Sequence, residues 1–478
     1  MKNKKIASVF FTFLVFGFSA YSWALADTAT TSSSTIVSQA TSTPVNTSGA
    51  ATSTAIGLQA PLIPPLIAEI TQAKQDLAAI TLNHALSAVY KTTKNKKTGK
   101  TAKIISKYNL TSKDIALAIW NPTTNSIITT VGMQTGQSMK FSDPAVDIKL
   151  TSFNGVNSKF QINTPANGTV LALKYLITGP ESGSKASIEN ALSPSLYVPY
   201  SAGLNDPSVE TFGEQYLDSI IHNVATSLQN FPSQAIPGET VTQAIPPAMI
   251  KALVYAEHTD TNQVLNGNVQ DTINQLNILF ATNQADAYKY SVSTANARGI
   301  AQFIPSTYAS LVNRHPDANL IADFNTAMAD HTNSIKAMYL LLDDYAGAVR
   351  VKAAQNFASA RVFEYGAASY NGGTTRVANA VKQYGSNWNE DRSGQINDIQ
   401  GQINGLTSQV KSLKSKIKKT ADKKTKSSLQ GSLASDQSLL ASATDQLSTL
   451  QSSTLKNETI NYLNKIYKVI TVFNDQTI

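Results

Sequence analysis

The chain has 478 residues and a net charge of +8, with 42% hydrophobic residues, 15% charged residues, 24 glycines, 17 prolines and no cysteine. Its low glycine and proline content excludes a collagen-like chain, and its apolar fraction is sufficient for the cores of about two or three domains. The absence of cysteine excludes disulfide scaffolds, cysteine-ligated zinc, thiol nucleophiles and a lipoprotein anchor.

The first 26 residues have the pattern of an export signal. Lysines precede an apolar run from Ile6 to Ala20, and Ala24-Leu25-Ala26 provides the small-x-small site that signal peptidase cuts. Cleavage before Asp27 leaves a net charge of +5. The alternative is an uncleaved membrane anchor, but an anchor needs about 20 apolar residues and polar residues dilute the end of this run. We therefore expect export to the periplasm or cell envelope, or secretion, and no integral membrane protein after cleavage.

Two segments separate the export signal from the first predicted domain. Residues 27–57 are rich in Ser and Thr, cannot bury enough apolar surface to fold, and are expected to form a disordered tether. Apolar residues recur at helical spacing after a proline pair at 64 and 65. Residues 58–107 are therefore expected to hold one or two helices as far as Tyr90, followed by a lysine-rich segment.

Short β-branched runs follow and predict a small β-rich accessory domain over residues 108–205. The runs Ile115–Trp120 and Ser126–Met133 flank a turn-forming stretch and are typical of a hairpin, and Thr169–Ile177 is typical of a further strand. The region shows no constellation of ligand-binding residues, so its pattern predicts no function.

A single glutamate on an apolar helix face is the first candidate functional residue. Helical periodicity returns over residues 206–392, where a proline pair at 246 and 247 provides a helix start. Glu257 follows Leu253 by four residues and Val254 by three, so it lies on their face of that helix. Burial raises the pKa of a carboxyl group, as a general acid near neutral pH requires. The alternative is that the helix ends here and Glu257 reaches solvent, because most perturbed carboxylates are structural.

Two further segments add weight to that candidate. The stretch Ser293–Thr307 contains small residues and Gly299, which permit close approach to a ligand, before a helix restart at Pro305. The stretch Phe363–Gly373 joins a helix to a turn and ends with an aromatic and an amide side chain. Each segment alone is a weak signal, but the ordered set is much less expected by chance.

Together these segments resemble the catalytic domain of the soluble lytic transglycosylases, which have a goose-type-lysozyme-like helical fold and cleave bacterial peptidoglycan. The family pattern is a helix ending in Glu-Ser, then Ser-x-x-Gly-Ala-x-Gly-Leu-Met-Gln, then Ala-Tyr-Asn-x-Gly, and finally Glu-Thr-x-x-Tyr-Val. This chain has four matching blocks in the same order, within residues 246–390 and 454–470: Ala256-Glu257-His258, Ser293–Gln302, Ala368–Gly373 and Glu458–Leu463.

The resemblance implies a role for each matching residue. Glu257 resembles the single catalytic acid and base of the family. That residue protonates the glycosidic oxygen between N-acetylmuramic acid and N-acetylglucosamine, then deprotonates the muramic C6 hydroxyl, which gives a 1,6-anhydro product without water. Ordinary glycosidases use paired carboxylates instead. The residues implied to contact the glycan strand are Ser293, Gln302, Tyr370, Asn371 and Glu458.

The chain departs from the family pattern at four positions, where Ser, Gly, Met and Ala are replaced by His258, Asn296, Ala301 and Ser369. His258 is either a modulator of the pKa of Glu257 or, as is more common for such a histidine, a packing substitute. The long spacing between the first two blocks predicts an inserted loop and a helix (Val269–Phe280) over residues 259–290.

A heptad pattern predicts an insertion within the catalytic region. Apolar residues alternate at spacings of three and four over residues 396–417 and again over 429–450, with Asp436 the one polar position. This pattern predicts an antiparallel coiled-coil hairpin over 393–453 with its turn at 420–428. The tip carries eight lysines between positions 411 and 426 and one acid, Asp422. It is either a solvated end or a docking arm for a protein partner or an anionic surface.

Neither a cofactor, a metal ion nor nucleic acid is an expected partner. Asp323, Asp330 and His331 are close in sequence, but adjacent Asp330 and His331 point to different sides of a helix and give no set of three ligands. The lysines are not interleaved with aromatic residues and the chain is expected to be exported, which argues against nucleic acid.

The sequence therefore predicts a mainly α fold, in which a lysozyme-like helical catalytic domain is interrupted by an antiparallel coiled-coil hairpin and preceded by a small β-rich domain. The leading function is a lytic transglycosylase that acts on peptidoglycan glycan strands. The alternatives are a hydrolytic muramidase on the same fold and a non-catalytic glycan-binding scaffold of an envelope machine. The expected segments are 1–26 (signal peptide), 27–57 (tether), 58–107 (helical and lysine-rich), 108–205 (β-rich), 206–392 (first part of the catalytic domain), 393–453 (hairpin) and 454–478 (closing helix).

Overall fold

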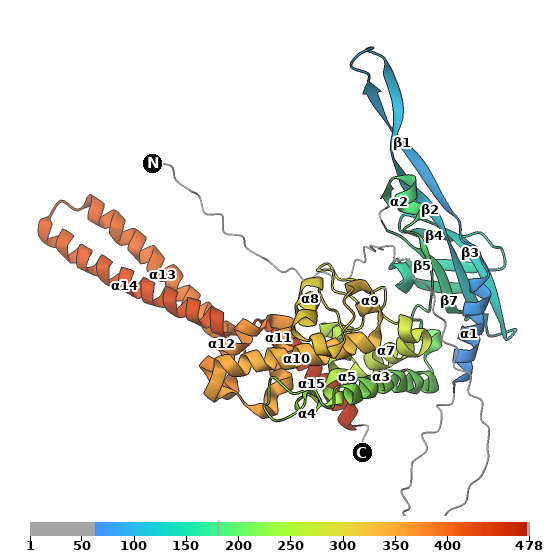
Figure 1. The fold of residues 1–478 in the computed structure, drawn as a ribbon. Coiled ribbons are helices and arrows are strands. Elements are labelled where there is room, and N and C mark those ends of the chain that lie inside the picture. The colour runs from blue at the N-terminus through green and yellow to red at the C-terminus, as the bar shows by residue number, and fades with distance from the viewer. Residues whose placement is uncertain (1–62, 180, 476–478) are drawn as a thin grey trace, which may run out of the picture. The chain divides into compact units, whose positions relative to one another are not determined.

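The computed structural model describes residues 63–179 and 181–475. The expected signal peptide (1–26) and tether (27–57) lie outside the described residues. The chain divides into two compact units, one up to Phe212 and one from Gly213. It is mainly helical with a separate antiparallel sheet region, as the sequence predicts (Figure 1). Among the described helices, none is both long and apolar enough to cross a membrane.

The first unit, called here the β unit, is built on an antiparallel sheet (Figure 1). The strand order is β4-β3-β2-β7-β9, β1 and β8 also pair with β2, and β5 and β6 form a separate two-stranded sheet. The elements are α1 (Pro65–Ala78), β1 (His84–Lys94), β2 (Thr101–Asn121), β3 (Ser126–Thr135), β4 (Ser138–Phe141), β5 (Asp147–Ser152), β6 (Lys159–Thr164), β7 (Thr169–Ile177), β8 (Ser182–Gly183), α2 (Lys185–Glu189) and β9 (Ser193–Tyr197).

The prediction of one or two helices as far as Tyr90, within residues 58–107, is wrong beyond α1. The helix ends at Ala78, and β1 begins at His84 and pairs with β2. The lysine-rich segment thus forms two strands and their turn. Spacing of apolar residues cannot reveal this change, because the hydrogen bonds of β1 come from a strand that follows it in the chain. The β-rich region therefore begins at His84, ahead of residue 108.

Helix α1 packs against the sheet through β7, β2 and β9. Pro65 occupies its first turn, where the missing N–H costs no hydrogen bond. Lys174 of β7 donates hydrogen bonds from Nζ to the carbonyl oxygens of Ala78 (2.9 Å) and Ile80 (2.6 Å) at the end of the helix. The residues that α1 buries are Ile67, Ile70, Ala73 and Leu77.

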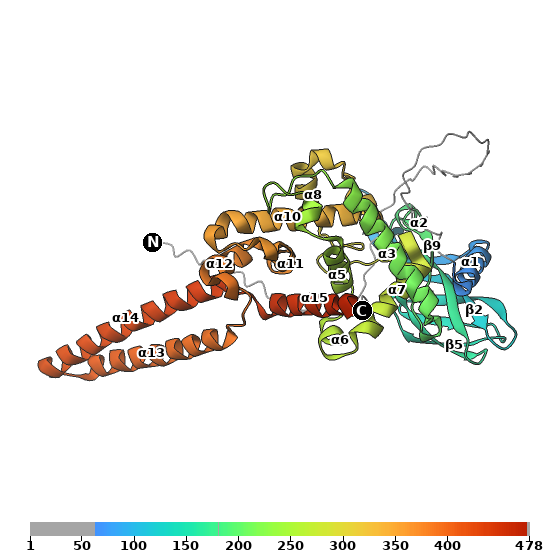
Figure 2. The same ribbon diagram turned by 90° about the horizontal axis from the view of Figure 1, so that it is seen from below.

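The second unit, called here the helical unit, packs around α10 (Figure 2). This helix is buried along most of its length and contacts α4, α5, α8, α9, α11 and α12. The elements are α3 (Pro207–Ser227), which carries the boundary between the units, α4 (Val241–Ala244), α5 (Pro247–Glu257), α6 (Thr261–Asn266), α7 (Val269–Asn283), α8 (Pro305–Arg314), α9 (Phe324–Ala329), α10 (His331–Ala353), α11 (Val362–Gly372), α12 (Thr374–Tyr384), α13 (Ser393–Lys419), α14 (Lys423–Ser453) and α15 (Asn457–Asp475).

Helices α13 and α14 form a hairpin that projects from the helical unit (Figures 1 and 2). The apolar positions of the heptad pattern are buried or half-buried, while nearly all the positions between them are exposed. The turn is shorter than the predicted 420–428, because α13 continues to Lys419 and α14 begins at Lys423. The carboxylate of Asp422 allows this early start by accepting a hydrogen bond from the N–H of Thr425 at 2.7 Å. After the hairpin, α15 returns to contact α5, α6 and α11.

Candidate functional site

Glu257 is the last residue of helix α5, at the edge of the helical core. The proline pair at 246 and 247 starts this helix, and Ile250, Leu253 and Val254 are completely buried, which fixes the face on which Glu257 lies. The helix stops at Glu257, whose side chain stays partly exposed. The carboxyl group is therefore anchored in apolar surroundings, in a residue that is half-buried.

Two side chains of α15, Tyr462 and Lys465, affect the pKa of Glu257. The hydroxyl of Tyr462 donates a hydrogen bond to Oε1 of Glu257. Lys465 is 6% exposed and donates to the carbonyl oxygen of Thr259 at 3.0 Å. Burial raises the pKa of Glu257, and the Tyr462 hydrogen bond and the Lys465 charge lower it without cancelling the rise. The carboxyl group therefore keeps its proton to a higher pH than an ordinary glutamate does.

Residues 299–302 form a backbone turn that is hydrogen-bonded to two other segments. His258, directly after Glu257, donates from Nε2 to the carbonyl oxygen of Ile300 at 2.8 Å. The hydroxyl of Tyr370, near the end of α11, donates to the carbonyl oxygen of Ala301. Tyr370 is also close enough to Glu257 for the carboxylate charge to contribute to its raised pKa, although burial is the larger cause.

A fourth hydrogen bond closes these contacts into a ring. Oγ1 of Thr459, in α15, donates to Oδ1 of Asn371, in α11, at 3.0 Å. The four bonds join residues separated by 42, 69, 88 and 205 positions in the chain. All four blocks that resemble the transglycosylase pattern thus meet beside one carboxyl group. The set, called here the Glu257 ring, comprises the pairs His258–Ile300, Tyr370–Ala301, Thr459–Asn371 and Tyr462–Glu257.

Three other predicted glycan-contacting residues lie outside the four bonds of the ring. Ser293 Oγ accepts hydrogen bonds from two backbone N–H groups of its own turn, at 3.0 and 3.2 Å. Gln302 Nε2 donates to the carbonyl oxygen of Gly299 at 2.8 Å. Gly299 has φ +69°, and a Cβ there would lie 2.2 Å from a carbonyl oxygen of α9, so only glycine fits. Glu458 is exposed in the first turn of α15. Gln302 therefore stabilises the turn 299–302 beside Glu257, and Ser293 stabilises the preceding turn, 293–297.

His258 is held as a neutral side chain. Its ring stacks on Tyr288, with 3.7 Å between the ring centroids and 21° between the ring planes. Burial lowers the pKa of His258 to about 3, so the imidazole is uncharged near neutral pH. Its bond to the Ile300 carbonyl and this stacking favour the packing role over the hypothesis that its charge modulates Glu257.

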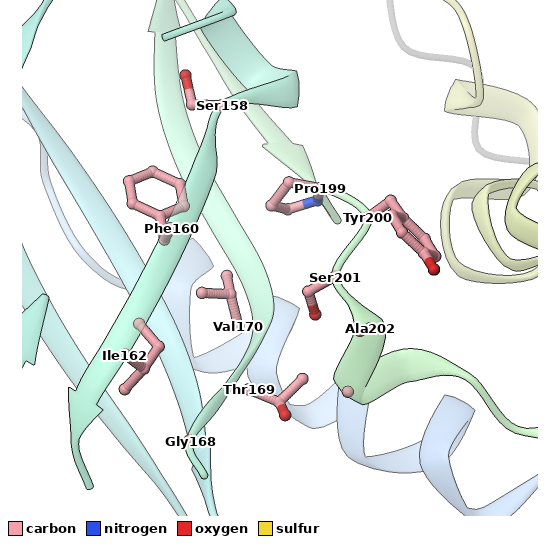
Figure 3. Close-up of a pocket in the computed structure, with 11 residues that line it drawn as sticks. Ser158, Phe160, Ile162, Gly168, Thr169, Val170, Pro199, Tyr200, Ser201 and Ala202 are labelled. Carbon is pink, nitrogen blue, oxygen red and sulfur yellow. The ribbon is translucent and has the colours of Figure 1, made fainter. Parts of the chain in front are cut away.

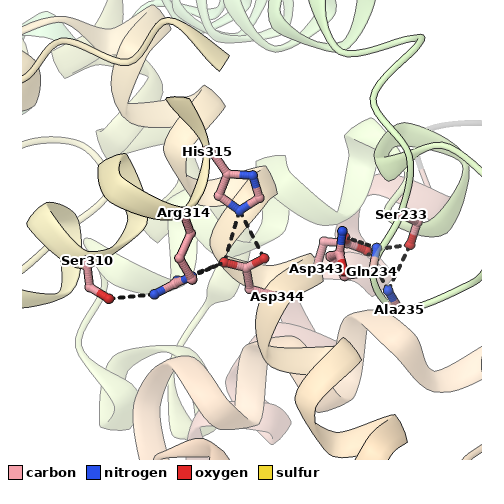
Figure 4. A network of polar contacts seen from close by, with 8 residues as sticks. All are labelled: Ser233, Gln234, Ala235, Ser310, Arg314, His315, Asp343 and Asp344. Atoms are coloured by element: carbon pink, nitrogen blue, oxygen red, sulfur yellow. Dashed lines mark hydrogen bonds and ion pairs between the residues drawn. The ribbon is translucent and has the colours of Figure 1, made fainter. Parts of the chain in front are cut away.

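A second buried carboxylate in the helical unit is fully engaged in holding the fold (Figure 4). Asp343 of α10 is 1% exposed. It accepts hydrogen bonds from the Ser233 hydroxyl and the Gln234 N–H, each at 2.5 Å, and from the Ala235 N–H at 3.2 Å. Burial raises the pKa of Asp343 as well. A raised pKa alone therefore does not identify a catalytic acid.

One hollow in each unit was considered as a ligand site, and neither is lined by a residue of the Glu257 ring. In the β unit, a cavity of about 200 Å³ lies between β6, β7 and residues 199–203 (Figure 3). None of the described residues that line it is charged, so it offers neither an acid nor a base. In the helical unit, a groove of about 700 Å³ is lined in part by α10 residues that include Tyr345. Its other lining residues include Arg314 and Asp344, and none of them belongs to the Glu257 ring.

The acidic residues considered for a metal site have structural partners. The carboxylates of Asp323 and Asp330 cap α9 and α10. His331 donates from Nε2 to the carbonyl oxygen of Ala287 at 2.8 Å. Within residues 63–179 and 181–475, no group of three or more potential metal ligands occurs.

Sequence reasoning missed Tyr462 and Lys465 as the partners of Glu257. Tyr462 lies in the fourth block and Lys465 lies just after it. The residue predicted to contact the glycan in this block is Glu458. The available signal was a lysine three residues after an aromatic on a helix face with Leu463 and Ile466 as buried neighbours. Comparisons of the chain with protein-family models, with curated proteins and with solved structures find no match. The geometry of the Glu257 ring is therefore the basis for assigning a function.

Proposed function

We propose that the chain is a lytic transglycosylase that cleaves the β-1,4 bond between N-acetylmuramic acid and N-acetylglucosamine in peptidoglycan. The products are 1,6-anhydromuramic ends. The observation that carries the proposal is the Glu257 ring, in which four distant segments meet beside one partly exposed carboxyl group of raised pKa. The proposal includes a lysozyme-like fold for the helical unit and coiled-coil packing for α13 and α14.

In the proposed reaction, Glu257 acts twice. Its raised pKa favours the protonated carboxyl group, which transfers its proton to the glycosidic oxygen as the bond to C1 breaks. Because the Tyr462 hydroxyl donates to Oε1, Oε2 is the oxygen that carries the transferred proton. The Tyr462 hydrogen bond and the Lys465 charge then stabilise the carboxylate. It next takes the proton of the muramic C6 hydroxyl, whose oxygen closes onto C1 and restores the acid.

The surroundings of Glu257 suit a reaction that uses one carboxyl group. The side chains that lower its pKa are a hydroxyl and an ammonium, whereas ordinary glycosidases place a second carboxylate across the scissile bond. Tyr370, whose pKa is affected by the Glu257 charge, is a proposed contact of the glycan strand. Tyrosine rings offer flat apolar faces to sugars.

The proposed setting is the cell envelope, after export by the signal that the sequence predicts. The lysine-rich tip between α13 and α14 is proposed as a docking arm for a protein partner, with an anionic surface as the alternative. A variant in which residues 394–453 are replaced by a short Gly-Ser linker tests this arm. Loss of partner capture with cell-wall activity retained supports the docking role, and retention of both activity and partners contradicts it.

Mass spectrometry of the muropeptides that the protein releases from purified sacculi tests the proposed reaction. The chain from Asp27 onward is expected to release fragments with 1,6-anhydromuramic ends, and Glu257→Gln is expected to release none. Glu239→Gln is a matched control, because it makes the same carboxyl-to-amide change in the helical unit outside the Glu257 ring.

Each other outcome has a defined meaning. Reducing ends in place of anhydro ends would indicate a hydrolytic muramidase and contradict the proposed closure by the C6 hydroxyl. No release by the unaltered protein, with binding to sacculi intact, would favour the glycan-binding scaffold. Equal release by the Glu257→Gln variant would show that Glu257 is not the catalytic acid and base.

A further inference from the structure

The hairpin of β1 and β2 extends beyond the rest of the sheet in the β unit (Figure 1). The pairing of β2 with β8 ends at Tyr108, and from there to the turn β2 pairs with β1 alone. Every residue from Tyr90 to Lys107 is exposed except Thr93, which is half-buried. We call residues 90–107 the β arm. Because the β arm has no core, its side chains are free to meet another surface.

The β arm is strongly basic. It contains no Asp or Glu and seven lysines, which are Lys91, Lys94, Lys96, Lys97, Lys100, Lys103 and Lys107. Three of them lie in the turn, whose conformation is fixed: Asn95 Oδ1 accepts hydrogen bonds from the N–H of Lys97 (2.9 Å) and Thr98 (3.2 Å). Gly99 supplies the positive φ of +69° that the turn requires. The positive charge is therefore concentrated at the end of an ordered projection.

Exposed apolar side chains accompany these lysines. Tyr90 is 60% exposed and lies opposite Ile105, which is 46% exposed, so the two form a cross-strand pair. Ile104 is 42% exposed and lies opposite Lys91. Lysines on an edge strand also prevent strand-to-strand aggregation. That role does not explain why large apolar side chains are exposed beside them. Basic and exposed apolar groups together fit a surface that has anionic groups over an apolar phase.

We propose that the β arm binds a lipid bilayer that carries anionic headgroups. The lysines near the turn contact the headgroup phosphates, and Tyr90 and Ile105 enter the interfacial region. A soluble anionic polymer satisfies only the lysines, because it offers no apolar phase for the tyrosine and isoleucine. Among the described residues, the lysine-rich tip of α13 and α14 has no large apolar side chain of comparable exposure, so its composition fits a bilayer less well.

Vesicle flotation tests the proposal with the full chain from Asp27 onward. Vesicles of phosphatidylcholine alone are compared with vesicles in which about a third of the lipid is phosphatidylglycerol. The unaltered protein is expected to float with the anionic vesicles only. Replacement of Lys94, Lys96, Lys97 and Lys100 by Gln is expected to weaken binding on the order of several hundredfold, since each lysine near an anionic surface contributes roughly fivefold.

A matched control changes four lysines at the other basic tip, Lys416, Lys418, Lys419 and Lys423, to Gln. This variant loses the same charge and is expected to keep most of the binding. A second variant, Tyr90→Ser with Ile105→Ser, is expected to lose the binding that survives at high salt, where the lysine contribution is screened. All the changed residues are exposed, so the thermal unfolding of each variant should match that of the unaltered protein.

Three results would overturn the proposal. The first is the absence of flotation with anionic vesicles. The second is an equal or larger loss in the control variant, which would assign lipid binding to the α13–α14 tip. The third is unchanged flotation of the Tyr90→Ser, Ile105→Ser variant together with competition by soluble polyphosphate, which would indicate a site for anionic polymers. The test needs no cell-wall activity, so it is independent of the proposed reaction.

Discussion

Asp343 and Glu257 are two carboxyl groups of the helical unit whose surroundings differ. Asp343 lies within α10 and is met by three donors, all from the segment 233–235. Glu257 lies at the end of α5 and is met at Oε1 by one hydroxyl, while its side chain remains partly exposed. Burial raises the pKa of both groups. The difference that matters is whether a carboxyl oxygen remains for a substrate, and only Glu257 retains one.

The largest expected effect separates the two groups by activity. Glu257→Gln is expected to lower the rate of muropeptide release by about 10³-fold or more, because the amide has no proton to transfer. Asp343→Asn is expected to change the rate per folded molecule by less than about threefold. Initial rates on dye-labelled sacculi, normalised to the folded fraction, measure both. A large loss of rate for Asp343→Asn with the fold intact would contradict the assignment of Glu257 as catalytic and Asp343 as structural.

Stability is expected to separate the same groups in the opposite sense. Asp343→Ala leaves the Ser233 hydroxyl and two backbone N–H groups without their acceptor, and is expected to cost about 3 kcal/mol of the free energy of unfolding. For a unit of this size, that loss lowers the midpoint of thermal unfolding by roughly 10 °C. Calorimetry at pH 7 measures the shift. A midpoint within about 2 °C of the unaltered protein would mean that the segment 233–235 does not depend on Asp343.

The pH dependence of activity is expected to reveal the partner of Glu257. Activity that needs protonated Glu257 falls as the pH rises through the pKa of that group. Tyr462→Phe removes a hydrogen bond that lowers this pKa, so the falling limb is expected to move to higher pH, with the maximal rate lowered about tenfold.

Tyr370→Phe is the matched control for that profile. Its hydroxyl donates to the Ala301 carbonyl and not to Glu257, so its loss is expected to lower the rate without moving the falling limb. An unmoved limb in Tyr462→Phe, or an equal movement in both variants, would show that the Tyr462 hydrogen bond does not set the pKa of Glu257.

The smallest expected effect is a gain in stability when Glu257 is neutralised. A carboxyl group with a raised pKa stabilises the folded state most below its ordinary pKa and loses this contribution as the pH rises through the folded-state value. Glu257→Gln is therefore expected to unfold a few degrees above the unaltered protein at pH 8, with the difference vanishing near pH 4. Thermal unfolding across this range measures it, and a difference that grows toward low pH would reverse the assigned direction.

Much of the fold could be predicted where local pattern and tertiary environment agree. The heptad positions of α13 and α14 are the less exposed residues of those helices, and β7 spans the predicted Thr169–Ile177. The segment from His84 to Lys107 could not be predicted, because β1 is largely exposed and has no buried face to impose an alternating pattern. Only its pairing with β2 makes it a strand.

The candidate site could be predicted as a set of segments but not as a set of contacts. Glu257 and Tyr370 follow from their positions on helices, and the structure places both beside the turn 299–302. The role of Tyr462 depends on how α15 returns after the hairpin. Residue types along α15 do not show whether Glu458 or Tyr462 meets Glu257, because both lie on related turns of the same helix.

The position of Tyr462 also has a consequence for when the site exists during synthesis. The acid and its hydroxyl partner are 205 residues apart, and the second of them lies in α15, which is made after both arms of the hairpin. A chain still emerging, or cut before Asn457, carries Glu257 without Tyr462 or Lys465. For the proposed enzyme, the active site is completed only by α15, so the cell that makes the protein meets no finished enzyme until α15 has been synthesised and has packed against α5.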